Sequence, residues 1–100
     1  SRRWPAAAVG AFGGQGRRFA ETGQAVRGPF LAYWESRGGL AIYGFPISPE
    51  MVEVLDDGKP YLVQYFERNR LEYHPELPEQ YRVSLGLLGV DKLRARGWLP

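Results

Sequence analysis

The side chains that most often carry out catalysis are scarce in this chain. His74 is the only histidine, and cysteine is absent. Ser48 and Ser84 lack the glycine context of a nucleophile elbow. A lone histidine supplies neither a metal-binding cluster nor a cysteine–histidine pair. We therefore expect no metal site, no cofactor and no covalent catalysis.

Paired carboxylates are the remaining chemistry that the sequence offers. Glu53 stands to pair with Glu67 or Glu72 across neighbouring strands, and Glu50 lies near a proline turn. A glycosidase needs two carboxyl groups about 5–9 Å apart, and cross-strand pairs meet that spacing in many sheets. Here the glutamates alternate with apolar residues, which is typical of a solvated face. We expect that the chain is not an enzyme.

Aromatic side chains are the second group that carries chemistry, because they stack on sugars and bases as well as fill cores. The candidates for a ligand platform are Trp34, Tyr43, Tyr61, Tyr65 and Tyr73. Alternation along the central strand puts Tyr61 and Tyr65 on the face opposite Phe66. Since phenylalanine has no polar tip, we expect the Phe66 face in the core and the two tyrosines half exposed. Ordinary packing with solvated hydroxyls is the alternative.

Charge and composition limit the partners. The 100 residues carry a formal net charge of +2, divided between +4 over residues 1–37 and −2 over residues 38–100. This charge is too small to indicate nucleic-acid binding, and the glycines of residues 10–16 lack the Gly-Lys-Ser/Thr ending of a phosphate loop. No apolar run is long enough to cross a bilayer. We expect neither nucleic acid as a partner nor a membrane-spanning segment.

Residues 1–18 form an Ala/Gly/Arg-rich stretch that we interpret as an arm or linker. Two large aromatics and two adjacent arginines in it are candidates for assembly with another copy: Trp4, Phe12, Arg17 and Arg18. The remainder, residues 19–100, reads as one module, because a chain of this length provides one small core.

Local signals place the elements of that module. Residues 19–26 read as an extended segment around a turn at Thr22-Gly23. Pro29, Phe30, Tyr33, Trp34 and Arg37 predict a helix over residues 29–37 that begins after Gly28 and ends at Gly38.

Beyond that helix, residues 40–45 read as a loop or a very short strand. Strands follow at residues 51–55, 60–67 and 70–74, joined by a hairpin turn at residues 56–59 and by a turn in which Asn69 is expected at positive φ. Helices are expected at residues 79–88 and 90–96.

Several spaced motifs of this module resemble the LGFP repeat of bacterial secreted and cell-envelope proteins. They are Gly38-Gly39-Leu40, Gly44-Phe45-Pro46-Ile47-Ser48, Asp57-Gly58, Gln64-Tyr65-Phe66-Glu67-Arg68 and Leu71-Glu72-Tyr73. Residues 19–24 resemble the Phe-x-x-Thr-Gly-His opening of a variant in Chloroflexota-like bacteria, with Gln24 in place of histidine. Ile42-Tyr43 also departs from the motif, which has leucine directly before its glycine. The resemblance covers residues 19–89 and implies anchoring to the cell wall or envelope without catalytic residues.

We therefore predict an α+β fold: a three-stranded antiparallel meander, with a short helix before it and a helical pair after it. The predicted function is that of an extracellular or cell-surface module that binds peptidoglycan, another envelope glycan or a partner protein. The alternative is a structural subunit of a self-assembling layer or filament that uses the N-terminal arm.

Overall fold

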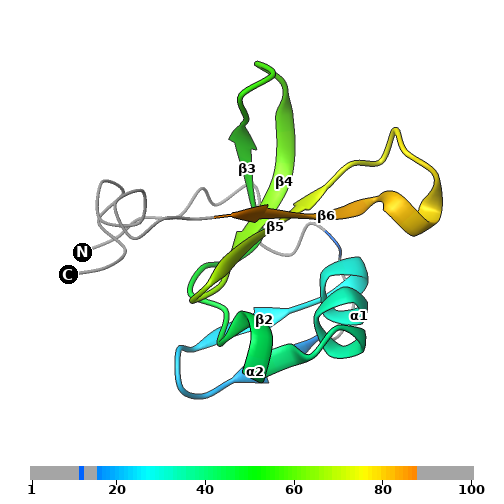
Figure 1. The fold of residues 1–100 in the computed structure, drawn as a ribbon. Helices are drawn as coiled ribbons and strands as arrows, with labels where there is room; N and C mark the ends of the chain where they lie inside the picture. The colour runs from blue at the N-terminus through cyan, green and yellow to red at the C-terminus, as the bar shows by residue number, and fades with distance from the viewer. Residues whose placement is uncertain (1–11, 13–15, 88–100) are drawn as a thin grey trace.

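Four antiparallel strands in sequence order form the larger sheet of the chain (Figure 1). The computed structural model describes Phe12 and residues 16–87. The strands of this sheet are β3 (Met51–Val54), β4 (Pro60–Tyr65), β5 (Asn69–Tyr73) and β6 (Val83–Leu87). Below them in Figure 1 lie a two-stranded hairpin and two helices, so the α+β class is confirmed.

The turn between β3 and β4 follows from its residues. Gly58 adopts φ 79°, and the Leu55 and Lys59 backbones pair across the turn with an N–O distance of 3.0 Å. Asp57 also accepts a hydrogen bond of 3.0 Å from the Lys59 amide. Pro60 stands at the first position of its strand, where a missing donor costs least. The predicted hairpin is therefore confirmed.

Strand β6 corrects the prediction of a helix at residues 79–88. Val83 lies opposite Tyr73 and Leu85 opposite Leu71, so the apolar residues follow the strand period of two. Gly86 permits this pairing, because an added Cβ would lie 2.6 Å from Glu72 Oε2 and 2.8 Å from Arg70 Nε. Within the described residues, the meander therefore has four strands where three were expected. A 3₁₀ helix, η2 (Glu79–Tyr81), precedes β6, and the helix expected at residues 90–96 lies outside the described residues.

The smaller sheet is the hairpin of β1 (Arg17–Phe19) and β2 (Gln24–Val26). Gly23 adopts φ 72° in its turn, and its amide donates to the Phe19 carbonyl at 2.8 Å. The predicted turn at Thr22-Gly23 is confirmed. The strand begins inside the segment expected to be an arm, since Arg17 pairs with Val26.

Helix α1 (Gly28–Ser36) confirms the helix predicted from the aromatic spacing, although Arg27 rather than Gly28 is its N-cap. Helix α2 (Gly39–Tyr43) corrects the loop or short strand expected at residues 40–45. Gly38 at φ 109° and Gly39 at φ 49° turn the chain out of α1 and directly into α2.

The second predicted turn differs in its backbone. No residue other than glycine has a positive φ in the described part of the chain, so the expectation for Asn69 is wrong. Asn69 instead begins β5, and its carbonyl accepts a hydrogen bond of 2.7 Å from the Phe66 amide. The turn between β4 and β5 is thus closed by this hydrogen bond without a residue in the left-handed conformation.

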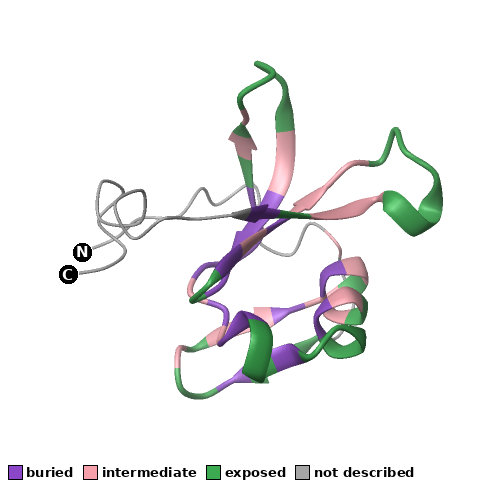
Figure 2. Ribbon diagram, in the orientation of Figure 1, coloured by how far each residue is buried: buried purple, intermediate pink, exposed green. Residues whose placement is uncertain are grey.

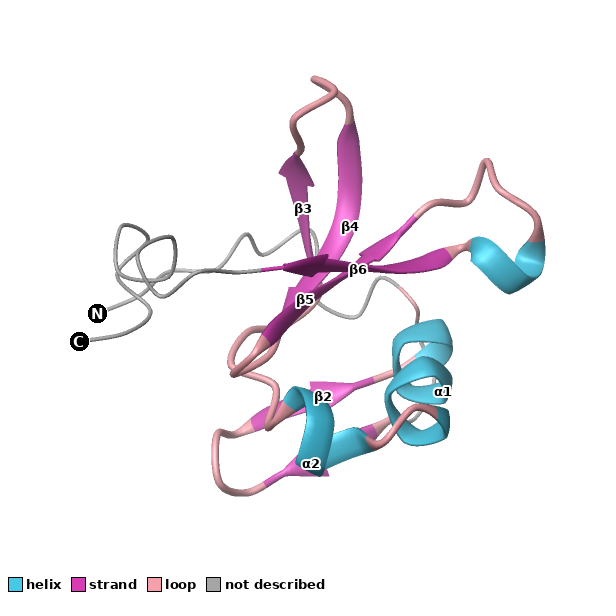
Figure 3. Cartoon of the chain, viewed as in Figure 1, coloured by secondary structure: helices cyan, strands magenta, loops and turns pink. Residues whose placement is uncertain are grey.

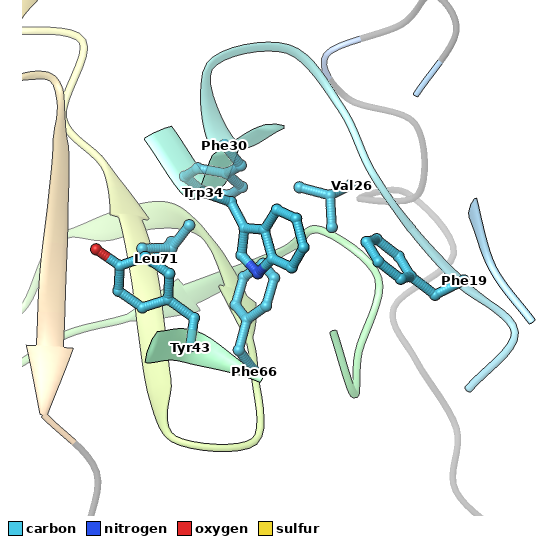
Figure 4. Packing of buried hydrophobic residues seen from close by; sticks show 7 residues of the cluster. All are labelled: Phe19, Val26, Phe30, Trp34, Tyr43, Phe66 and Leu71. Atoms are coloured by element: carbon cyan, nitrogen blue, oxygen red, sulfur yellow. The ribbon is translucent and has the colours of Figure 1, made fainter. Parts of the chain in front are cut away.

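One face of the large sheet packs against α1 and the hairpin to make the main core. Figure 4 shows the buried side chains that share it: Phe19, Val26, Phe30, Trp34, Tyr43, Phe66 and Leu71. A second, smaller cluster of Met51, Val63 and Tyr65 lies on the opposite face. Figure 2 shows buried positions both where the strands cross and on the side of α1 toward the hairpin. The expectation that Phe66 belongs to the core is confirmed.

Candidate ligand-binding cleft

A cleft of about 450 Å³ lies between α1 and the chain that leads into β6. Figure 3 shows η2 as the short helix between β5 and β6. The described lining residues come from α1, β5, η2 and β6, and from Arg37 and Arg82, which follow α1 and η2: Pro29, Ala32, Tyr33, Ser36, Arg37, Tyr73, Glu79, Gln80, Arg82 and Val83. Rigid elements therefore supply most of the cleft, which suits a preformed binding site.

One face of α1 supplies half of this lining. Four residues follow Pro29 in this lining at intervals of three, four, seven and eight, the spacing of a single helical face, and the last of them, Arg37, is the C-cap of α1. The neighbouring face carries Phe30 and Trp34, which are buried in the core. Because that packing fixes the rotation of the helix, Tyr33 and Arg37 are held toward the cleft.

The opposite wall is a loop that is closed by its own hydrogen bonds. The His74 amide donates to the Arg82 carbonyl at 2.6 Å, and the Leu77 amide donates to the His74 carbonyl at 3.1 Å. Arg82 Nε donates to the Leu77 carbonyl at 3.0 Å. Tyr73 joins this wall to the sheet, where it pairs with Val83. These hydrogen bonds therefore hold the backbone that carries Gln80 and Arg82 in place beside the cleft.

Guanidinium groups dominate the charge of the cleft, with Arg37 and Arg82 against Glu79. The Arg37 guanidinium carbon lies 4.6 Å from the centroid of the Tyr33 ring, a cation–π contact. Burial and then the neighbouring Tyr33 raise the pKa of the Tyr43 phenol, while Arg37 acts in the opposite direction. Among the described residues, neither Arg37 nor Arg82 forms an ion pair.

A second polar cluster lies on the other face of the sheet and is centred on Arg70. Its terminal nitrogens lie 2.6 Å from Glu72 Oε2 and 3.7 Å from Glu53 Oε2. Tyr65 donates a hydrogen bond of 2.6 Å to Glu53 Oε1. Burial lowers the pKa of the Arg70 guanidinium, but its hydrogen bonds to Tyr65 and Glu72 outweigh that effect, and the pKa is raised.

The same cluster continues along β5 to His74. The imidazole lies between two carboxylates, with Nε2 3.2 Å from Glu72 Oε1 and Nδ1 3.4 Å from Glu76 Oε2. The Tyr61 ring packs on it at a centroid distance of 4.4 Å. In the described residues, no three histidine, cysteine or acidic side chains gather as a metal site requires.

The carboxylate pairs expected from the sequence have separate surroundings. Glu53 and Glu72 share a face, but Arg70 bridges them. Glu67 instead accepts a hydrogen bond of 2.8 Å from the Phe45 amide. Glu50 is fully buried, with Arg27 Nη1 3.6 Å from its Oε2. A water-accessible pair of the glycosidase type is not formed by these groups.

Three of the five predicted platform residues are buried. Trp34 and Tyr43 are part of the main core, and Tyr65 is wholly inaccessible in the second cluster. The expectation that Tyr65 is half exposed is therefore wrong. Both faces of β4 are buried near its end, so alternation there does not separate core from surface.

Tyr61 and Tyr73 are the two predicted platform residues that are partly exposed. Tyr73 lies in the cleft. Tyr61 lies in a smaller depression of about 300 Å³ and donates a hydrogen bond to Asp57. That bond is the main cause that raises the pKa of Tyr61 to about 12 and lowers the pKa of Asp57. The structure thus places these two tyrosines in different depressions.

Those predicted assembly residues that the structure describes do not form a free arm. Phe12 makes edge-to-face contacts with Phe30 and Tyr73 of its own chain, at centroid distances of 5.0 and 5.1 Å. Arg17 pairs with Glu35 at 3.3 Å, and Arg18 is exposed on β1. Trp4 lies outside the described residues. Phe12 is therefore occupied as a core contact rather than presented to another copy.

Tyr33, Arg37 and Arg82 line the cleft but were not among the candidates predicted from the sequence. The spacing of Pro29, Tyr33 and Arg37 was a usable signal, because it marks a helical face beside the buried one. Arg82 had no such signal, since its position depends on β6 and on the loop before it.

The described part of the chain is an α+β fold with a surface cleft whose lining is aromatic and net basic. Comparison with protein-family models, with curated proteins and with solved structures gives no match. None of the helices in the described part of the chain has the length and apolarity to cross a lipid bilayer.

Proposed function

We propose that this chain is a non-catalytic extracellular or cell-surface module that binds an envelope glycan in the cleft between α1 and β6. The observation that carries the proposal is the composition of the cleft. Tyr33 and Tyr73 supply ring surface with polar tips, and Arg37, Gln80 and Arg82 supply hydrogen-bond donors. Apolar area with a few placed polar groups is what a site for a sugar polymer requires.

The absence of a catalytic role is supported by how the candidate acids are used. Arg70 lies between Glu53 and Glu72, and each carboxylate is engaged with it. Both nitrogens of His74 face carboxylates. The resemblance to LGFP repeats supports the envelope as the location.

A blocked cleft tests this proposal. Ala32 is exposed on the cleft face of α1, so Ala32→Trp fills the cleft without entering the core. Ala41→Trp on the exposed side of α2 is the matched control. In co-sedimentation with purified peptidoglycan and soluble glycans, we expect Ala32→Trp to abolish binding and Ala41→Trp to retain it. Equal binding by both variants would place the site elsewhere.

Self-assembly is a second candidate, and one observation favours it. Strand β3 is an outer strand of the described sheet, and its Val52 and Val54 side chains are 56 % and 63 % exposed. β3 itself contains no lysine or proline, the residues that commonly protect an edge strand from pairing with another strand.

Light-scattering mass after size exclusion separates the two routes to an oligomer. The chain without residues 1–11 keeps Phe12 and β1 and tests the arm, while Val52→Lys tests the edge. Loss of oligomers only in the truncated chain would assign assembly to the arm, and loss only in Val52→Lys would assign it to β3. A monomer in every case would remove this candidate.

A further inference from the structure

Two arginines face the cleft without a carboxylate partner. In the described part of the chain, Arg17, Arg27 and Arg70 form ion pairs, whereas Arg18, Arg37, Arg68 and Arg82 form none. Of these four, Arg37 and Arg82 line the cleft. Among the described residues that line the cleft, Glu79 is the single acidic one. The described lining of the cleft is therefore net positive.

Both guanidinium groups are held in place by uncharged contacts. Arg37 stacks on the Tyr33 ring, and Arg82 is tied through Nε to the Leu77 carbonyl. Such contacts reduce the freedom of the side chain while leaving terminal N–H groups for another acceptor. The planar fork of arginine matches the two oxygens of a carboxylate or phosphate group.

The two arginines come from opposite walls. Arg37 follows the last turn of α1, and Arg82 ends the loop before β6. A chain that lies in the cleft would pass between them, with Tyr33 and Tyr73 against its sugar rings. A polymer with repeated anionic groups can contact both guanidinium groups at once, whereas a single small anion would contact only one of them.

We infer that the glycan bound in this cleft is anionic and that its carboxylate or phosphate groups are taken by Arg37 and Arg82. This inference rests on the proposed function, because it names the class of ligand for the same cleft. It also makes charge, rather than sugar identity alone, the basis of selectivity.

The test compares one glycan with and without its charge, and adds a phosphate polymer with a different backbone. Isothermal titration would use polygalacturonate, its fully methyl-esterified form and poly(glycerol phosphate). We expect the acidic polymers to bind at least about tenfold more tightly than the ester, because each lost charge-assisted contact weakens binding by about that factor. Comparing the affinities for polygalacturonate and poly(glycerol phosphate) shows whether a carboxylate or a phosphate is preferred. A preference for either anion over the ester supports the inference.

Arginine variants assign the charge to the cleft. We expect Arg37→Gln and Arg82→Gln each to weaken binding of the acidic polymer about tenfold, and Arg82→Lys to recover part of that loss. Arg18→Gln on β1 removes the same charge outside the cleft and should leave binding unchanged. Circular dichroism confirms that each variant is folded.

Three results would overturn the inference. Equal binding of the acidic and esterified forms, with loss in Ala32→Trp, would keep the cleft as a glycan site but remove the anionic class. An equal effect of Arg18→Gln and Arg37→Gln would indicate attraction to the whole surface rather than to the cleft. Failure of the wild-type chain to bind any glycan would contradict the proposed function itself.

Discussion

The indole Nε1 of Trp34 donates a hydrogen bond of 3.1 Å to the carbonyl oxygen of Gly44, and both residues are buried. This bond joins the inward face of α1 to the residue that ends α2. It therefore fixes α1 against the chain that leads into the sheet, and it fixes the cleft face of the same helix.

Gly44 itself gives the first prediction. Gly44 and Gly58 both adopt φ 79°, but a Cβ at Gly44 would lie 2.6 Å from Glu67 Oε1, whereas nothing lies within 4 Å at Gly58. We expect Gly44→Ala to cost about 2–4 kcal/mol, from backbone strain and displacement of Glu67, and Gly58→Ala about 1–2 kcal/mol, from strain alone. Urea unfolding measures both, and equal costs would contradict the packing at Gly44.

Removal of the indole donor is the second prediction. Trp34→Phe keeps an aromatic ring but leaves the buried Gly44 carbonyl without its partner, which should cost about 1–3 kcal/mol before any loss of packing. Tyr81→Phe, at a residue 61 % exposed, is the control and should be nearly neutral. An unchanged urea midpoint in Trp34→Phe would show that the bond contributes little.

The third prediction concerns the ion pairs of Arg70. Arg70→Met would leave Glu53 and Glu72 facing each other with little exposure, and we expect a loss of about 3–5 kcal/mol in the free energy of unfolding. Glu35→Gln breaks the exposed pair with Arg17 and should cost less than about 1 kcal/mol. Thermal unfolding of both variants separates the cases, and a small loss in Arg70→Met would show that the carboxylates tolerate each other.

The fourth prediction concerns pH. The pKa of Tyr61 is raised to about 12, so its stabilising contribution is complete below its ordinary value of 10.0 and is lost as pH rises toward 12. The pKa of Asp57 is lowered from 3.8, so its contribution is present above that value and is lost as pH falls below it. In a tyrosinate absorbance titration, the wild-type minus Tyr61→Phe difference should show one late ionisation. In Asp57→Asn, the pKa of the Tyr61 phenol should return toward its ordinary value of 10.0.

Turn chemistry and helical spacing explain how much of the fold was predictable. The Asp57-Gly58 turn, the Thr22-Gly23 turn and the glycine after α1 all have the conformations that their sequences favour. Strand β6 was mistaken for a helix because Val83 and Leu87 also fit a helical spacing. The competing signal was Gly86, whose missing side chain makes room for Arg70 and Glu72 of the neighbouring strand β5.

The candidate site was less predictable for a related reason. The tyrosines of β4 read as a surface row, but Tyr65 is covered in the second cluster and Tyr61 is turned to Asp57 and His74. Only tertiary structure brings Arg37 and Arg82 into one cleft, since they are far apart in the chain and belong to different elements.

That separation along the chain has a thermodynamic consequence. A ligand held by α1 on one side and by η2 and β6 on the other acts as a reversible cross-link between two layers of the domain. At a concentration one hundred times its dissociation constant it would add about 2.7 kcal/mol to the free energy of unfolding. Amide hydrogen exchange should then slow in α1 and β6 together, while amides of the outer strand β3 that exchange by local opening keep their former rate.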